Sequence, residues 1–174
     1  FTNDGVTKLD HEIEKYVSAS GSEELIAWVK IPGLSSSADT IIYMYYGNSS
    51  ASNQQNPTGV WDSDYKAVWH LKEDQAGTGT SGLYQDSTIN NNDGNDEISA
   101  TGKGGQINSG QEFDGTTLPY DYVVTPSNSS LGVKERSTAE AWVRLETTTV
   151  ARTVYEIYSS VVMRHYFVFP TSGS

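Results

Sequence analysis

The densest run of oxygen-bearing side chains covers residues 86–94, Asp-Ser-Thr-Ile-Asn-Asn-Asn-Asp-Gly. Carboxylate and amide oxygens are the ligands that Ca²⁺ prefers in proteins. An EF-hand does not fit, because the position of its closing Glu, counted from the loop glycine, falls on Ala100. An irregular Ca²⁺ site assembled from separate loops would use the side chains of Asp86, Asn92, Asp93 and Asp114. The alternative, which turn preferences favour, is that these residues set turns by hydrogen bonding to nearby backbone.

A second group of carboxylates, Asp10, Glu12 and Glu14, alternates along a predicted strand and therefore shares one of its faces. Two carboxyl groups about 5–5.5 Å apart are what a retaining glycosidase needs. Lys8 and Lys15 lie nearby, however, and charged residues are mostly exposed, so we expect a solvated strand face. The sequence also lacks cysteine, a Gly-x-Ser-x-Gly motif and a phosphate-binding loop. We therefore expect no enzymatic activity.

Aromatic side chains could bind sugars, because their faces suit the apolar patches of a pyranose ring. We expect ligand contacts at Trp61, Tyr120 and Tyr122, which lie beside acidic residues in predicted loops or strand ends. The other three tryptophans lie inside apolar strand patterns and are predicted to belong to the core: Trp28, Trp69 and Trp142. His70 follows Trp69 directly, and we expect a packed or hydrogen-bonded structural role for it.

Asn-x-Ser patterns at Asn48 and Asn128 predict N-glycosylation sites, since both fall in predicted surface loops. The composition excludes other partners. With 22 acidic and 11 basic residues the net charge is −11, which disfavours binding to the phosphates of a nucleic acid. No apolar run approaches the roughly 18–20 residues of a membrane span. The sequence begins at Phe1 rather than Met, which we interpret as a mature or excised fragment.

Short strands separated by turn residues dominate the predicted secondary structure, and no helical periodicity is sustained. The pattern is typical of an all-β fold built from sandwiches. Residues 40–46, Thr-Ile-Ile-Tyr-Met-Tyr-Tyr, form the strongest predicted strand, and their continuous apolar character predicts burial on both faces. The predicted strands cover residues 9–16, 23–31, 40–46, 65–71, 111–113, 120–125, 138–145, 153–158 and 161–169.

Successive parts of the sequence resemble two different protein families. Residues 1–16, 27–32 and 42–48 resemble the second half of a domain of unknown function that recurs on surface proteins of bacteria and archaea. From Ala67 onward the sequence resembles laminin-G-like, concanavalin-A-like lectin domains. The motifs that carry this second resemblance are residues 68–71, 86–88, 92–94, 100–103, 113–115, 122–123 and 139–143.

The resemblance implies two jelly-roll-like β-sandwich modules, at residues 1–62 and 63–174, both incomplete in this chain. The lectin-like family continues with a Trp-His pair that is not found after Trp142, so the second module would be truncated or completed by other residues. We expect an extracellular, non-enzymatic surface segment that binds carbohydrate or another cell-surface ligand. Two alternatives remain: a structural subunit of a filament or cell-wall layer that self-associates through strand edges, or an accessory domain of a glycoside hydrolase.

Overall fold

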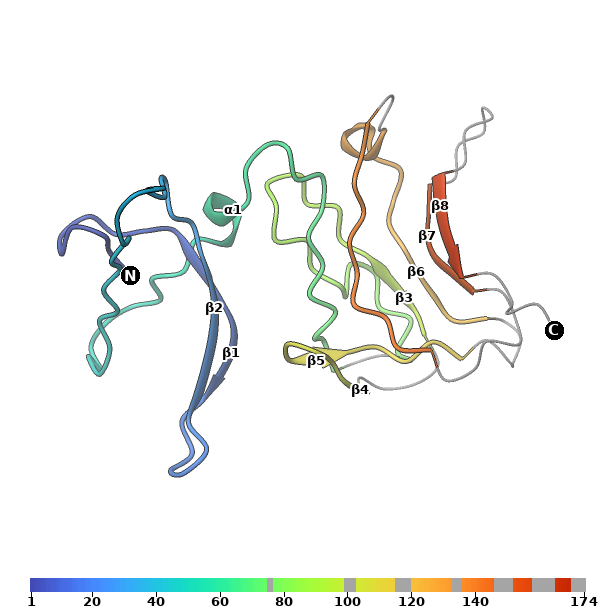
Figure 1. The fold of residues 1–174 in the computed structure, drawn as a ribbon. Helices are drawn as coiled ribbons and strands as arrows, with labels where there is room; N and C mark the ends of the chain where they lie inside the picture. Colours follow the sequence, from blue (N-terminus) through green and yellow to red (C-terminus); the bar gives the residue numbers. More distant parts are fainter. Residues whose placement is uncertain are drawn as a thin grey trace. The chain divides into compact units, whose positions relative to one another are not determined.

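The structure, a computed structural model, describes residues 1–74, 77–98, 103–114, 120–132, 136–145, 152–157 and 165–169 (Figure 1). The chain divides into two compact units, Phe1–Ser127 and Asn128–Ser174. The first unit contains β1 (His11–Val17), β2 (Glu24–Val29), the short helix α1 (Pro57–Val60), β3 (Asn95–Glu97), β4 (Lys103–Gly104), β5 (Ser109–Gly110) and β6 (Tyr122–Val124). The second contains the 3₁₀ turn η1 (Ser129–Leu131), β7 (Arg152–Ile157) and β8 (His165–Phe169).

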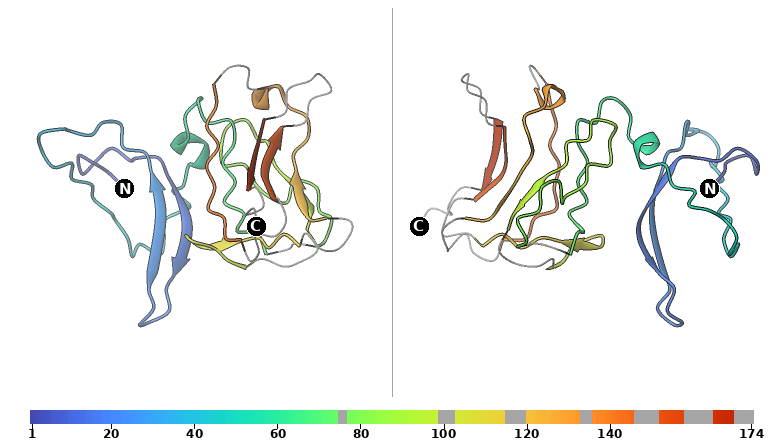
Figure 2. Two further views of the ribbon diagram at one scale, coloured as in Figure 1. Left: turned by 45° about the vertical axis from the view of Figure 1, so that its right-hand side comes forward. Right: turned by 180° about the vertical axis from the view of Figure 1, so that it is seen from behind.

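The described strands form four two-stranded antiparallel sheets, β1–β2, β3–β6, β4–β5 and β7–β8. Figure 2 shows the β1–β2 and β7–β8 hairpins from two further sides. The predicted all-β fold is thus confirmed, whereas its arrangement as two sandwiches, divided at residues 62 and 63, stays a prediction. Within the described ranges no helix has the length and apolar character needed to cross a bilayer.

The β1–β2 hairpin follows from the alternating sequence of residues 9–16 and the turn residues after Val17. Glu12 pairs with Trp28 and Ile13 with Ala27, after which the register shifts and Lys15 pairs with Ile26. The pairing therefore skips Glu14, which is the extra residue of a β-bulge. Bulges redirect the side chain that they carry, and this one matters because Glu14 contributes to the site described below.

The interior of the first unit is unusually polar. Only three large apolar side chains are buried among the described residues, Leu9, Tyr84 and Ile98. The buried polar and charged side chains outnumber them: Thr2, His11, Glu12, Glu14, Asp86, Ser87, Thr88, Asn92 and Asp96. Buried polar groups are costly unless they are hydrogen bonded, so the fold of this unit depends on how these groups are paired.

Tyr84 and Ile98 form the apolar centre, with Trp69 and Val123 packed against them. This confirms the predicted core position of Trp69. A Cβ atom at Gly94 would lie only 2.5 Å from Cγ1 of Val123, so the close packing here requires glycine. The phenol of Tyr84 donates to Oδ1 of the buried Asp96 at 3.0 Å, and burial together with this carboxylate raises the pKa of Tyr84.

Residues 40–46 do not form the strand predicted for them. Their described backbone hydrogen bonds are limited to one pair, between Tyr43 and Thr2 at 2.8 and 3.0 Å. The six apolar side chains of residues 41–46 are 39–86 % exposed, so the prediction that both faces of this segment are buried was wrong. The physical reason is that a strand is stable only when neighbours pair with it and cover it, and the described residues supply a single bridge. We call these six residues segment 41–46.

The strand predicted over residues 138–145 is likewise absent from the described part, where residues 136–145 have no regular structure. Trp142 is 75 % exposed and Val143 is also exposed, so the core position predicted for Trp142 was wrong. The predicted strands near residues 9–16, 23–31, 120–125, 153–158 and 161–169 are confirmed as β1, β2, β6, β7 and β8, with residues 158 and 161–164 outside the described ranges.

Candidate functional site

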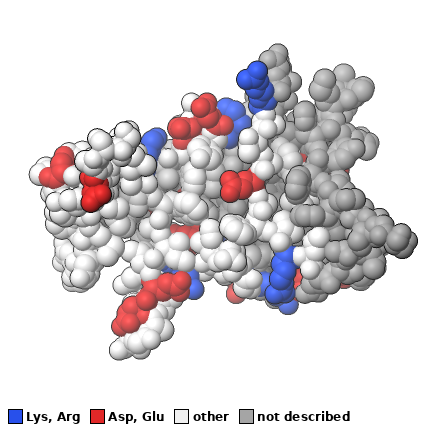
Figure 3. All heavy atoms as spheres, viewed as in Figure 1, with Lys and Arg blue, Asp and Glu red and all other residues white. Residues whose placement is uncertain are grey.

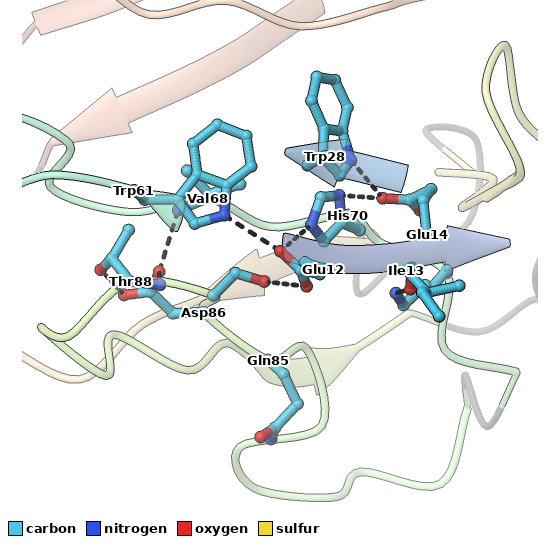
Figure 4. A network of polar contacts seen from close by, with 12 residues as sticks. Glu12, Ile13, Glu14, Trp28, Trp61, Val68, His70, Gln85, Asp86 and Thr88 are labelled. Atoms are coloured by element: carbon cyan, nitrogen blue, oxygen red, sulfur yellow. Dashed lines mark hydrogen bonds and ion pairs between the residues drawn. The ribbon is translucent and has the colours of Figure 1, made fainter. Parts of the chain in front are cut away.

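His70 lies between two carboxylates from the same strand, β1, and Figure 4 shows its ring between them. Nε2 of the imidazole lies 3.2 Å from Oε2 of Glu12, and Nδ1 contacts Oε2 of Glu14. The side chains of Glu12, Glu14 and His70 are all at least nine-tenths buried. One ring therefore neutralises two buried carboxylates by using both of its nitrogens. We call these three residues, with Trp28, Trp61 and Ser87, the ionic cluster.

Three further donors complete the ionic cluster. The indole Nε1 of Trp61 donates to Oε2 of Glu12 at 3.1 Å, and that of Trp28 donates to Oε2 of Glu14 at 3.0 Å (Figure 4). The hydroxyl of Ser87 donates to Oε1 of Glu12 at 2.7 Å. The two indoles also pack on each other, with ring centroids 5.4 Å apart, and Trp28 stacks on the imidazole at 6.1 Å. Polar contacts and aromatic packing thus fix the same side chains.

The solvated strand face expected for Asp10, Glu12 and Glu14 was wrong for two of the three residues. Glu12 and Glu14 are 5 % and 6 % exposed, whereas Asp10 is partly exposed and accepts a hydrogen bond from Nδ2 of Asn56. The alternation did identify a shared face correctly. It could not identify that face as the buried one, because the residues that compensate its charge come from distant parts of the sequence.

Charge pairing changes the acidity of all three ionisable members. Burial alone would raise the pKa of Glu12, but the ion pair with His70 and the hydrogen bonds from Ser87 and Trp61 hold it at about 2. Burial would likewise raise the pKa of Glu14, yet His70 and Trp28 lower it, with help from the charge of Lys72. Burial alone would lower the pKa of His70, but the two carboxylates raise it to about 9. At neutral pH the cluster therefore contains an imidazolium and two carboxylates.

The order of contacts in the ionic cluster does not suit nucleophilic catalysis. In a Ser-His-Asp triad the imidazole accepts the proton of the serine. Here Ser87 donates to Glu12, and both ring nitrogens of His70 already face carboxylates. A general acid of a glycosidase needs a raised pKa, whereas both glutamates have lowered ones. The arrangement is suited to holding β1 against residues 61–87.

The backbone next to His70 is strained. Leu71 has φ of 53°, a left-handed conformation that costs an L-residue about 1–2 kcal/mol. The side chain of Leu71 packs against the Tyr84–Ile98 centre, and its carbonyl accepts a hydrogen bond from Nε2 of Gln111 at 3.0 Å. These contacts stabilise a turn that lets residue 70 face the carboxylates while residue 71 faces the apolar centre. The sequence contains no pattern that would have predicted this turn.

Three of the four candidate Ca²⁺ ligands lie together in residues 86–94, but the carboxylates of Asp86 and Asp93 accept hydrogen bonds from the chain itself, and Nδ2 of Asn92 donates to the Lys66 carbonyl at 2.8 Å. Oδ1 of Asp86 accepts from the amides of Val68 and Thr88 at 3.0 and 2.9 Å. Oδ2 accepts from the Thr88 hydroxyl and the Asn92 amide at 2.9 and 2.8 Å. Asp93 accepts from the Asp86 amide at 2.8 Å. These contacts are the ones expected if the polar residues of 86–94 set turns by hydrogen bonding to nearby backbone.

Asp114, the fourth candidate, belongs to a different turn. Its amide donates to Oδ2 of Asp121 at 2.8 Å, and its carbonyl accepts from the Asp121 amide at 3.3 Å. Within the described ranges no three His, Asp or Glu side chains converge in a way that could hold a metal ion. Binding of Ca²⁺ at residues 86–94 stays a proposal. To bind Asp86, the ion would have to displace the backbone amides and the hydroxyl that donate to this carboxylate.

The predicted ligand contacts fall in two places. Trp61 lies inside the ionic cluster, where it also packs edge-on against Tyr65 with ring centroids 5.1 Å apart. Tyr120 and Tyr122 are 56 % and 49 % exposed and flank Asp121. Tyr122 is the first residue of β6, and Tyr120 lies two residues before that strand. An aromatic surface is therefore present at the two tyrosines, whereas the Trp61 ring already contacts other aromatic rings.

Both predicted glycosylation sites are exposed. The side chain of Asn48 accepts from the Ser50 amide, and that of Asn128 accepts from the Ser130 amide, each at 3.0 Å. Asn128 in this way caps η1. Exposure is what a glycosyltransferase requires, and glycan attachment at these two residues stays a prediction.

Residues 1–79 match the family described as "Domain of unknown function (DUF2341)". This confirms the first of the two predicted resemblances, and the match includes Glu12, Glu14, Trp28, Trp61 and His70 but ends before Ser87. The lectin-like resemblance of the following residues stays a prediction. No curated protein and no solved structure shows a significant match to this chain.

The ionic cluster predicts a specific dependence of stability on pH. The pKa of His70 is raised from 6.5 to about 9, so its contribution is complete below pH 6.5 and is lost as the pH rises through 9. The pKa of Glu12 is lowered from 4.5 to about 2, so its contribution is complete above pH 4.5 and is lost as the pH falls through 2. We expect the urea midpoint to be highest between pH 4.5 and 6.5.

A His70→Gln variant isolates the cluster in that experiment. It should lose about 3–5 kcal/mol of unfolding free energy at neutral pH, because two buried carboxylates lose their cation. The decline in stability above pH 6.5 should disappear with the imidazole. A His11→Gln variant, which leaves the cluster intact, should keep the decline. A wild-type urea midpoint that is constant between pH 6.5 and 9 would show that His70 is not held as an imidazolium.

The contacts of Asp86 predict the outcome of an Asp86→Ala substitution. Removing this carboxylate leaves buried amides without an acceptor and should cost about 3 kcal/mol or more of unfolding free energy. The loss should be equal in calcium and in EDTA, because the donors belong to the protein. Asp64→Ala, at an exposed position, should change stability by less than about 0.5 kcal/mol. A melting temperature that rises with calcium only in the wild type would instead favour the cation site.

Proposed function

We propose that this chain is a non-catalytic module of an extracellular surface protein and that it works by protein–protein contact through segment 41–46. The observation that carries the proposal is the exposure of six consecutive large apolar side chains, from 39 % at Ile42 to 86 % at Tyr46. Scattered exposed apolar residues are normal, but a contiguous exposed group marks an interaction site. A segment with unpaired backbone groups is in addition a template for a strand of another polypeptide.

The ionic cluster supports a binding role rather than turnover. It is the place in the described first unit where acidic, basic and hydroxyl side chains converge, and each of them is buried and paired within the cluster. A catalytic site needs a group that can reach a substrate. The cluster instead stabilises the unit that presents segment 41–46. The family match at residues 1–79 includes segment 41–46 and every member of the ionic cluster except Ser87, and it assigns no activity to either.

Charge distribution also favours segment 41–46 as the contact surface. The longest stretch without Asp, Glu, Lys or Arg runs from Thr40 to Trp61. Elsewhere acidic and basic side chains are spread over the surface, as Figure 3 shows for one face. Charged residues are depleted at the centres of protein interfaces because they are costly to desolvate. An uncharged apolar segment in a chain of net charge −11 therefore has the composition of an interface centre.

Adhesion of coated beads tests this function. Beads carrying the chain should attach to a panel of immobilised extracellular proteins or to one another, and an Ile42→Lys variant should abolish the attachment by placing a charge in the apolar contact. Leu34→Lys is the matched control, because Leu34 is also apolar and exposed but lies outside the segment. Equal attachment of beads carrying the two variants would remove segment 41–46 from the function.

Carbohydrate binding is a second candidate, favoured by the exposure of Tyr120 and Tyr122 on either side of Asp121. Two exposed aromatic rings offer stacking surfaces for the apolar patches of a sugar ring. We expect Tyr120→Ala and Tyr122→Ala each to weaken any signal on a glycan array, whereas Tyr16→Ala, at another exposed tyrosine, should not. An array without signals at high protein concentration would leave protein contact as the sole candidate.

A further inference from the structure

One backbone edge of segment 41–46 has no hydrogen-bonding partner among the described residues. The bridge between Tyr43 and Thr2 shows which amides and carbonyls lie on that edge. In an extended chain the amide and carbonyl of one residue point to the same edge, and those of the next residue point to the opposite edge. Both backbone groups of Tyr43 face Thr2. The amides and carbonyls of Ile42 and Met44 therefore face away from Thr2, and these residues have no described backbone partner.

We propose that two copies of this chain associate through this free edge, with residues 40–46 paired antiparallel about a two-fold axis at Tyr43. The inference rests on the proposed function and names the partner. In this register Ile42 of one copy and Met44 of the other form a hydrogen-bonded pair, and the symmetry repeats that pair. Tyr43 faces its own counterpart in the non-hydrogen-bonded position, where the Cα atoms approach to about 4.5 Å.

Self-complementarity favours a second copy as the occupant. An interface with two-fold symmetry uses the same surface on both partners, so one contact satisfies the free edges of both chains. The register centred on Tyr43 overlaps the whole apolar run, since Thr40 then faces Tyr46 and Ile41 faces Tyr45. Because Ile42 and Met44 must stay on the shared edge, the register can change only in steps of two residues, and such a step pairs Tyr45 with Asp39 or Ile41 with Gly47.

Electrostatics permits this contact despite the net charge of −11. Asp39 is the charged residue next to the segment in sequence, and in this register it faces Gly47 of the other copy. The two Asp39 residues then lie at opposite ends of the pair, about 27 Å apart at a rise of about 3.4 Å per residue. That distance exceeds the Debye length of about 8 Å at physiological salt. Repulsion between them is therefore screened, and added salt should tighten the association.

The absence of cysteine from the sequence allows a direct test of the register. In a Tyr43→Cys variant the two introduced thiols should lie close enough for a disulfide, since cross-strand Cβ atoms of a non-hydrogen-bonded pair are about 4.5–5.5 Å apart. Mild oxidation should convert this variant to a covalent dimer. Met44→Cys, displaced from the axis, and Val6→Cys, exposed outside the segment, should cross-link much more slowly. Equal rates for the three variants would overturn the register.

Sedimentation of the whole chain tests the association itself. The wild type should shift with concentration from 19.0 kDa toward twice that mass, and Met44→Lys should remain at the monomer mass. The control Leu34→Lys should behave like the wild type. A wild type that stays monomeric at every concentration would overturn pairing between copies. If its beads still attached to other proteins through segment 41–46, the proposed function would nevertheless stand.

Discussion

The first unit depends on the neutralisation of two buried carboxylates by one imidazolium. Transferring Glu12 or Glu14 alone into the interior would cost several kcal/mol. His70 reduces that cost only because its two nitrogens reach both residues at once, which in turn requires the bulge at Glu14 and the turn at Leu71. The pairing of charges and the local backbone geometry are thus a single constraint. A hydrophobic interior would tolerate small shifts, whereas this one requires specific contacts.

The same constraint connects parts of the chain that the sequence separates. Glu12 contacts Trp61, His70 and Ser87, so β1 is attached to three later segments through one carboxylate. The family match at residues 1–79 ends between the last two of these contacts. Ser87 belongs to residues 86–94, where Asp86 holds the turn together. The polar loop that suggested a metal site therefore also supplies a donor to the ionic cluster.

The sequence was informative where local patterns decide the structure. Alternation and turn residues predicted the β1–β2 hairpin, and the Asp86 turn followed from the hydrogen-bonding habits of Asp and Asn. Alternation separated the two faces of β1 but could not show which was buried, because His70 lies 58 positions from Glu12. Apolar character likewise indicated that residues 40–46 favour burial. Whether any strand covers them depends on partners that local pattern cannot reveal.

The structure thereby reverses the usual distribution of polarity in its N-terminal part. Carboxylates of β1 are buried, while segment 41–46 exposes its apolar side chains. Each exposed apolar square ångström that is later covered contributes about 25 cal/mol, so the segment retains a driving force that the folding of the described residues has not used. Because charge pairing in the ionic cluster holds the interior together, the apolar side chains of segment 41–46 are not needed there and stay exposed. The ionic cluster, the Asp86 turn and the Tyr84–Ile98 centre hold the unit together without segment 41–46, which is left for association with another strand.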